Sequence, residues 1–246
     1  MGFFVGLSGV GGSAILAPML ILFLGVKPSL AIGTDLLYSV PAKILALVLH
    51  QRQGNVNWPI TRALLVGGLP GAIGGLVIFA QLKDHVEIGL LDAALRHAIG
   101  VAILLASAGA AALWLARFRQ KRSVPDPEVS LPFVTIVAIG AVVGVLVAVT
   151  SIGSGSITLP LLAFALPAVL LRRLIGAEIA FAAFLVPVAA VGHIGMGDVN
   201  WLMVASLLVG ALPGVWIGSR LCNLIGDHWL RPVVIGVLAF AGARLV

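Results

Sequence analysis

Long apolar runs follow one another along nearly the whole chain, with short polar stretches between them. The runs cover residues 3–25, 30–50, 59–82, 96–116, 132–150, 156–170, 174–195, 201–222 and 230–246. A helix needs about 20 residues to cross a hydrocarbon core of ~30 Å, and most runs approach that length. They are too continuous for the alternating pattern of transmembrane strands. The pattern therefore predicts an all-α integral membrane protein with about eight or nine transmembrane or half-spanning helices.

Composition and charge support a membrane protein. Hydrophobic residues make up 61% of the 246 residues and charged residues only 10%, whereas a soluble domain carries about 25% charged residues. The net charge of +6 suggests cytoplasmic loops rather than a nucleic-acid surface, because Lys and Arg concentrate on the cytoplasmic side. We interpret residues 117–131 as a basic cytoplasmic linker, with binding of anionic lipid as the alternative. Its basic residues are Arg117, Arg119, Lys121 and Arg122.

The linker separates two similar halves, an N-terminal membrane repeat at 1–116 and a C-terminal membrane repeat at 132–246. When the sequence is shifted by 143 positions, residues 50–75 match residues 193–218 at half of the positions. The first span of the N-terminal repeat is shortened or missing relative to the second copy. A complete repeat would hold five segments, and an odd number turns the second copy upside down. We therefore expect two homologous, inverted repeats with broken helices.

A glycine-rich break interrupts an apolar run in each half. The first break (residues 9–13) lies in "GLSGVGGSAILAP", and the second break (residues 151–156) lies in "VTSIGSGSITLP". In inverted-repeat transporters, such breaks direct the N–H groups of a half-helix at a bound anion. The alternatives are close helix packing, which we expect for Gly67, Gly71 and Gly75, and helix capping by the serines. The candidate substrate-binding residues are Gly9, Gly11, Gly12, Ser13, Ser151, Gly153, Ser154, Gly155 and Ser156.

Ionisable residues also occur inside the apolar runs, where a charge costs several kcal/mol unless it faces a cavity or a partner. Asp35, Lys43 and His50 share one face of a helix, and Glu178 and His193 repeat the two ends of that stripe. We expect Lys43 to bind an anionic substrate, and Asp35, His50, Glu178 and His193 to serve coupling or gating. Alternatively, Lys43 pairs with Asp35 or extends to the interface, and the histidines anchor the following turns.

The two breaks, together with "GNVNW" at 54–58 and "GDVNW" at 197–201, resemble the TauE/SafE family of sulfite and organosulfonate exporters. Ser154 departs from the family pattern, in which a third glycine is common. The resemblance implies a multi-pass permease of the cytoplasmic membrane that exports a small sulfur-containing anion, such as sulfite or sulfoacetate. Combined with the repeats, it predicts a secondary transporter with alternating access; a homodimer is an open alternative.

Two other functions fit parts of the same sequence. An anion channel is one, because paired breaks also build selectivity filters. The other is an intramembrane serine protease that uses Ser8 of "GLSG", which would need a neighbouring histidine to activate the serine. The chain has no H-E-x-x-H motif and no Walker loop, and Cys222 is its single cysteine. We therefore expect neither an enzyme nor a metal or cofactor.

Overall fold

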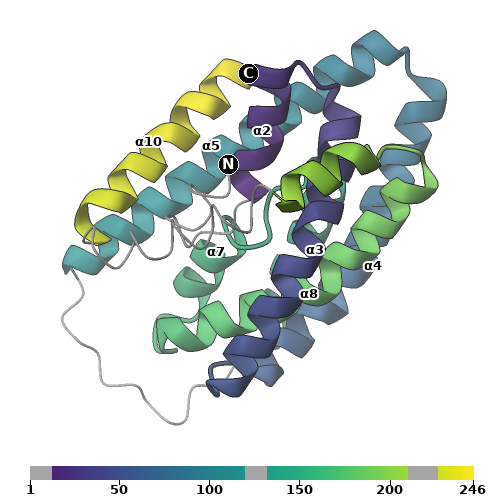
Figure 1. The fold of residues 1–246 in the computed structure, drawn as a ribbon. Helices are drawn as coiled ribbons and strands as arrows, with labels where there is room; N and C mark the ends of the chain where they lie inside the picture. The colour runs from purple at the N-terminus through teal and green to yellow at the C-terminus, as the bar shows by residue number, and fades with distance from the viewer. Residues whose placement is uncertain (1–12, 120–131, 210–226) are drawn as a thin grey trace.

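The computed structural model of the protein describes residues 13–119, 132–209 and 227–246. Their regular structure is entirely helical (Figure 1). Ser8, Gly9, Gly11 and Gly12, most of the linker and Cys222 lie outside the described residues. The helices are α2 (Ser13–Leu24), α3 (Pro28–Arg52), α4 (Trp58–His85), α5 (Ile88–Arg119), α6 (Phe133–Thr150), α7 (Thr158–Ala165), α8 (Leu171–Gly195) and α10 (Asp227–Leu245), with a further helical stretch at 201–209.

Five of the described helices are long and apolar enough to cross a membrane: α3, α4, α5, α6 and α8. Large hydrophobic side chains lie exposed on their outer faces, among them Leu45, Ile73, Leu105 and Val134. Such a surface would be unstable in water, but it suits contact with lipid chains. The structure therefore confirms the prediction of an all-helical, multi-pass membrane protein.

Two predicted boundaries were wrong. Helix α5 begins at Ile88 rather than at 96, because its early charged residues, such as Asp92 and Arg96, are at least partly exposed and do not interrupt the helix. The run at 156–170 forms only the short helix α7, whose C-cap is Leu166. Pro167 follows this residue, and a residue before proline is disfavoured in helical conformation. The helix therefore ends before 170 and is too short to cross a membrane, in agreement with the predicted half-spanning helices.

Helices α3 and α8 are equivalent in the two repeats, and they lie side by side (Figure 1). Gly33, near the start of α3, contacts Asp198, which follows the end of α8. Gly176, near the start of α8, contacts Asn55, which follows the end of α3. The shift of 143 positions exchanges these two contacts, as a two-fold axis requires. The helices are thus antiparallel, whereas an axis along the membrane normal would leave equivalent spanning helices parallel.

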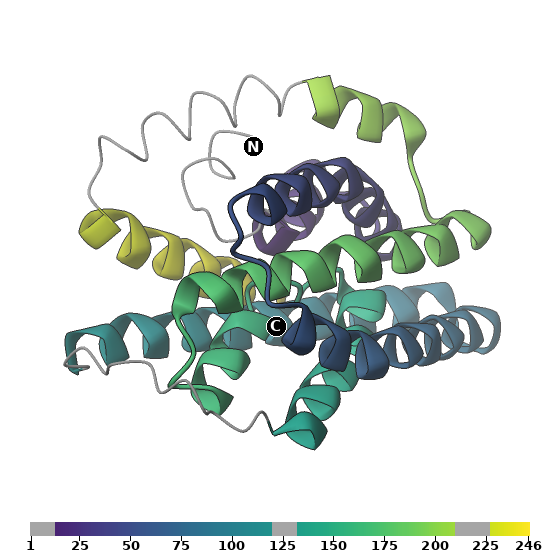
Figure 2. The same ribbon diagram turned by 90° about the horizontal axis from the view of Figure 1, so that it is seen from below.

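The last helices of the two halves, α5 and α10, are antiparallel to each other, as α3 and α8 are. Gly100 approaches Gly242 and Val246, while Ser107, further along α5, donates a hydrogen bond to the carbonyl of Ile235 at 3.0 Å. Figure 1 and Figure 2 show α10 in yellow beside α5 in teal. The order of these contacts makes the two helices antiparallel. Both pairs of helices therefore agree with the predicted inverted repeats.

Helices α4 and α6 pack closely because glycines line their contact. A Cβ atom added to Gly67 would collide with the carbonyl of Val137, and one added to Gly71 would collide with that of Ala141. On α6, a Cβ atom added to Gly140 would likewise collide with the carbonyl of Leu64. Small residues allow this close approach between membrane helices. The expectation of packing glycines is confirmed for α4.

Candidate functional site

The second break is an unwound segment inside the protein. Helix α6 ends at Thr150, and Ser151 then adopts a left-handed conformation with φ of 61°. Gly153 and Gly155 follow with φ of 137° and 106°, values that glycine adopts far more easily than other residues. All residues from 151 to 156 are buried. Unwound backbone at membrane depth is tolerated where it is buried in protein or lines a polar cavity, so the break occupies a permitted position.

Ser156 does not cap helix α7. The N-cap is Ile157, which forms no side-chain cap, and the Ser156 hydroxyl is buried without a hydrogen-bond partner among the described residues. Among the described residues, the backbone N–H groups of 154–156 also donate to no backbone carbonyl. Unused buried donors are rare in folded proteins. The capping alternative is therefore wrong for Ser156, and the second break keeps buried donors that are unused among the described residues.

Asp35 of α3 reaches the second break from the other repeat. The Ser151 hydroxyl donates to Asp35 Oδ2 at 2.5 Å. The Asp35 side chain is fully buried, and its Oδ1 has no hydrogen-bond partner among the described residues. A carboxyl group of the first repeat is thus fixed against the broken helix of the second repeat.

Lys43 also reaches the second break, and its partner is Glu178. Lys43 Nζ lies 3.7 Å from Glu178 Oε1, and the two side chains are 11% and 6% exposed. The same Nζ donates to the carbonyl of Ser154 at 3.5 Å. Gly155 lies against the acid, because a Cβ added there would be 3.3 Å from Glu178 Oε1. The alternative that paired Lys43 with Asp35 is therefore wrong: the lysine pairs across the two repeats.

The Lys43 contacts are long for charge-assisted hydrogen bonds, which are usually about 2.7–2.9 Å. Glu178 Oε1 accepts no hydrogen bond among the described residues despite its position near the lysine. A loosely held, buried ammonium group can exchange its acceptor for one that approaches more closely. Lys43, Glu178, Asp35 and the second break together form what we call the interrepeat cluster.

The two histidines lie apart from these contacts. His193 Nε2 is 2.8 Å from the carbonyl of Ala148, and its ring packs edge-on against Phe79. The ring of His193 thus ties α8 to the end of α6, while its backbone carbonyl accepts the N–H of Asp198 in the following turn at 3.0 Å. His50 Nδ1 is buried and has no hydrogen-bond partner among the described residues. No described contact joins either histidine to the interrepeat cluster.

The repeated "GNVNW" and "GDVNW" motifs have a structural role. Gly54 and Gly197 adopt positive φ angles of 68° and 75°, which end the preceding helices as left-handed residues commonly do. Asn57 Oδ1 accepts from the N–H of Ile60 at 3.3 Å. In the second half, Asn200 Oδ1 accepts from the N–H of Met203 at 3.0 Å. These asparagines are N-caps, and the motif encodes a helix–turn–helix junction.

One ion pair was missed by the sequence analysis. Lys83 Nζ lies 2.9 Å from both carboxylate oxygens of Asp198 and donates to the carbonyl of Met196 at 2.6 Å. The available signal was a departure from the repeat, since Asp198 stands where the first half has Asn55. This contact joins the end of α4 to the turn after α8.

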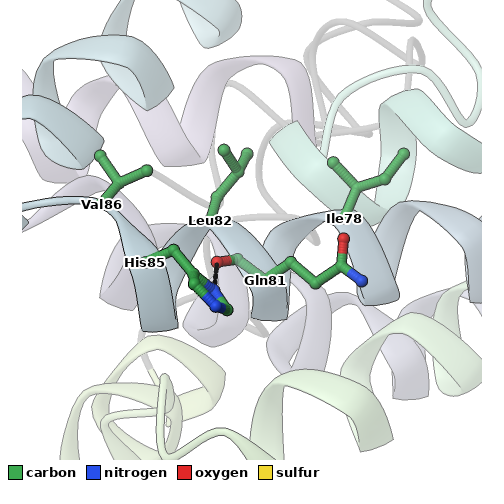
Figure 3. A pocket seen from close by; sticks show the side chains of 5 residues that line it. All are labelled: Ile78, Gln81, Leu82, His85 and Val86. Atoms are coloured by element: carbon green, nitrogen blue, oxygen red, sulfur yellow. Dashed lines mark hydrogen bonds between the residues drawn. The ribbon is translucent and has the colours of Figure 1, made fainter.

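A surface pocket at the end of α4 is separate from the cluster (Figure 3). Its lining comes from one helix end: Ile78, Gln81, Leu82, His85 and Val86. His85 Nδ1 is 3.0 Å from the backbone carbonyl of Gln81, so this ring nitrogen has a hydrogen-bond partner within its own helix. The residues that the structure describes contain no group of three or more ligating side chains suited to a metal ion.

Comparison with known proteins identifies the family. The family model described as "Sulfite exporter TauE/SafE" matches residues 1–245. The chain belongs to the TauE/SafE family. It is 33% identical to the probable membrane transporter protein YjnA of Bacillus subtilis, over 100% of this chain and 96% of the relative. It is also 26% identical to the probable membrane transporter protein YdhB of the same organism, over 100% of this chain and 96% of that relative.

A more distant relative is the probable membrane transporter protein MJ0441 of Methanocaldococcus jannaschii, 21% identical over 98% of this chain and 91% of the relative. No solved structure matches the chain significantly. Together with its membrane-spanning helices, membership of the TauE/SafE family makes the protein a multi-pass membrane transporter and not an enzyme. The serine protease hypothesis for Ser8 is therefore wrong.

Proposed function

We propose that this TauE/SafE protein is a secondary transporter that exports a small sulfur-containing anion, either sulfite or an organosulfonate such as sulfoacetate. Transport would cross the cytoplasmic membrane by alternating access. The observation that carries the proposal is the position of Lys43, a buried cation from one repeat that meets the broken helix of the other repeat. In membrane proteins, intramembrane ionisable residues commonly mark a substrate path.

In the proposed mechanism, the substrate takes the place of the Glu178 carboxylate. Glu178 is itself an oxyanion beside Lys43 Nζ, so a sulfite or sulfonate oxygen offers the lysine the same chemistry. Donors at 154–156, including the unpartnered hydroxyl of Ser156, would bind further oxygens. The first break would add donors from Gly9, Gly11, Gly12 and Ser13, by analogy with the second. The anion would then lie between the N-terminal ends of two half-helices.

The inverted repeats support alternating access. Because α3 and α8 are antiparallel equivalents, a site between them meets a similar backbone arrangement toward either side of the membrane. Rocking one repeat against the other would expose such a site to each side in turn. Export of an anion also needs no obligatory coupling ion, because the negative cell interior itself drives it with about 2.3 kcal/mol per charge per 100 mV.

Flux measurements in proteoliposomes test this function. Radiolabelled sulfite and sulfoacetate would be supplied outside vesicles that contain the full-length protein and are preloaded with unlabelled anion. A transporter gives uptake that saturates and that accelerates with anion on the opposite side. An anion channel gives flux that rises without saturation at low concentration and shows no such acceleration. The channel result, or no flux of either anion, would contradict the proposal.

A further inference from the structure

Asp35 is an acid that the anion-binding role of the cluster does not use. Its side chain is fully buried, and one of its oxygens accepts the Ser151 hydroxyl at 2.5 Å. Its other oxygen, Oδ1, has no hydrogen-bond partner among the described residues. A buried ionised carboxylate normally has a counter-ion or several donors. Within the part of the chain that the structure describes, Asp35 has a single donor, which leaves Oδ1 open to another partner.

The charged groups around Asp35 provide no dedicated counter-ion. Helix α3 contributes Tyr38 and Lys43, but the Lys43 ammonium is paired with Glu178. Helix α8 contributes Glu178 and His193, and the described part of α2 carries no titratable side chain. Helix α5 also contacts α3, and the titratable side chains that the structure describes on it are at least partly exposed: Asp92, Arg96 and His97. The turn after α8 contacts Gly33 and adds the buried Asp198, but this acid is paired with Lys83. Apart from that pair, the buried ammonium and carboxyl groups on the described segments around Asp35 are those of Lys43 and Glu178.

We propose that Asp35 is a proton-binding site that is linked to anion binding, so that anion and proton move together. The proton would bind Oδ1, while Oδ2 continues to accept the hydroxyl of Ser151. This inference rests on the proposed function, because it requires the anion to bind at Lys43. It adds a second transported species, a proton, to the anion carried by the same site.

The reason is the balance of buried charge. When an anion takes the lysine, Glu178 loses its partner, and an ionised Asp35 would leave two carboxylates and the anion facing one ammonium group. Like charges brought together in a poorly solvated site favour protonation of one of them. A proton on Asp35 removes one negative charge and leaves the Ser151 hydrogen bond intact. Binding of the anion and binding of the proton therefore strengthen each other, and such a linkage is reciprocal.

Proton uptake by the wild-type protein tests the linkage directly. Thiosulfate, an anion that stays ionised across this range, would be added to the purified full-length transporter in weakly buffered solution between pH 6 and pH 9. We expect uptake of about one proton per bound thiosulfate in the part of this range where free Asp35 is ionised. There, thiosulfate affinity should fall about tenfold for each unit by which the pH rises.

Two variants assign the effect to Asp35. Asp35→Asn should bind thiosulfate without proton uptake and with an affinity that no longer changes with pH. Asp84→Asn, a matched change at an exposed acid on α4, should behave like the wild type. Size-exclusion chromatography and thermal unfolding check that each variant is folded. If Asp35→Asn does not fold, proton uptake by the wild-type protein still tests the linkage.

The outcomes separate this inference from the proposed function. Wild-type protein that binds thiosulfate with no proton uptake anywhere from pH 6 to pH 9 overturns the proton site. A folded Asp35→Asn variant that still takes up a proton also overturns it, because the proton would then bind elsewhere. If the protein binds sulfoacetate but not thiosulfate, the same measurements with sulfoacetate, which also stays ionised between pH 6 and pH 9, decide the proton site by the same outcomes. If neither anion binds at any pH, the proposed function fails, and the inference fails with it.

Discussion

Lys43 is held by contacts of 3.5 Å and 3.7 Å to Ser154 and Glu178, and in the proposed function this loose pairing leaves its ammonium group available to an anion. We expect Lys43→Met to lower anion affinity by about 2 kcal/mol or more, because a desolvated anion would lose its opposite charge. The variant should also unfold more easily, since it leaves Glu178 buried without a cation. Equilibrium anion binding and thermal unfolding measure the two effects separately.

The double variant Lys43→Met with Glu178→Gln is the control for that prediction. It removes the unpaired charge, so most of the lost stability should return while anion binding stays weak. If the double variant regains both stability and binding, Lys43 serves only as the partner of Glu178. Wild-type affinity in Lys43→Met alone would contradict its role in binding just as directly.

At the scale of elements, the contact between α4 and α6 depends on its glycines. Gly67→Ala places a methyl group against the backbone carbonyl of Val137, where no side chain can move aside, and overpacking of this kind costs about 1–3 kcal/mol. Gly74→Ala on the same helix meets nothing within 4 Å. It should be neutral or stabilise by up to ~1 kcal/mol, because alanine favours helix over glycine. Thermal unfolding in one detergent compares the two variants, and equal stability would contradict this packing.

The elements that could be predicted are those with a strong local or repeated signal. Length and apolar character located α3, α4, α6 and α8. The duplicated asparagines at 57 and 200 were visible as a repeat, but their role as N-caps came from the structure. The end of α7 was missed because an apolar composition concealed the effect of Pro167. The apolar residues on both sides of Pro167 favour a continuous helix, but the residue before a proline is disfavoured in helical conformation.

The candidate site was only partly predictable, for a different reason. Buried ionisable residues and glycine breaks are visible in the sequence, so Asp35, Lys43, Glu178 and the second break were identified. Which of them touch depends on how α3 crosses α8 and where the unwound chain passes between them. No periodicity within one helix contains that information. For this reason Asp35 was considered as the partner of Lys43, whereas the structure pairs the lysine with Glu178 from the other repeat.

For the whole molecule, the antiparallel arrangement of α3 and α8 predicts that equivalent positions face opposite sides of the membrane. Arg52 and Gly195 are such a pair, related by 143 positions, and both are exposed at the ends of their helices. In a Cys222→Ser background, Arg52→Cys and Gly195→Cys should react with a membrane-impermeant maleimide from opposite sides of sealed vesicles. Labelling of both from the same side would contradict the inverted arrangement, and the Cys222→Ser protein alone gives the background labelling.

The most direct test of the account is a structure of the full-length protein determined with thiosulfate bound. We expect the anion near mid-membrane, with an oxygen close to Lys43 Nζ, donors from 154–156 around it, and Glu178 moved away from the lysine. Because the two repeats are related by a two-fold axis, the first break should approach the anion from the opposite side. An anion bound at the basic linker, with Lys43 and Glu178 still paired and both breaks packed without a ligand, would contradict the account.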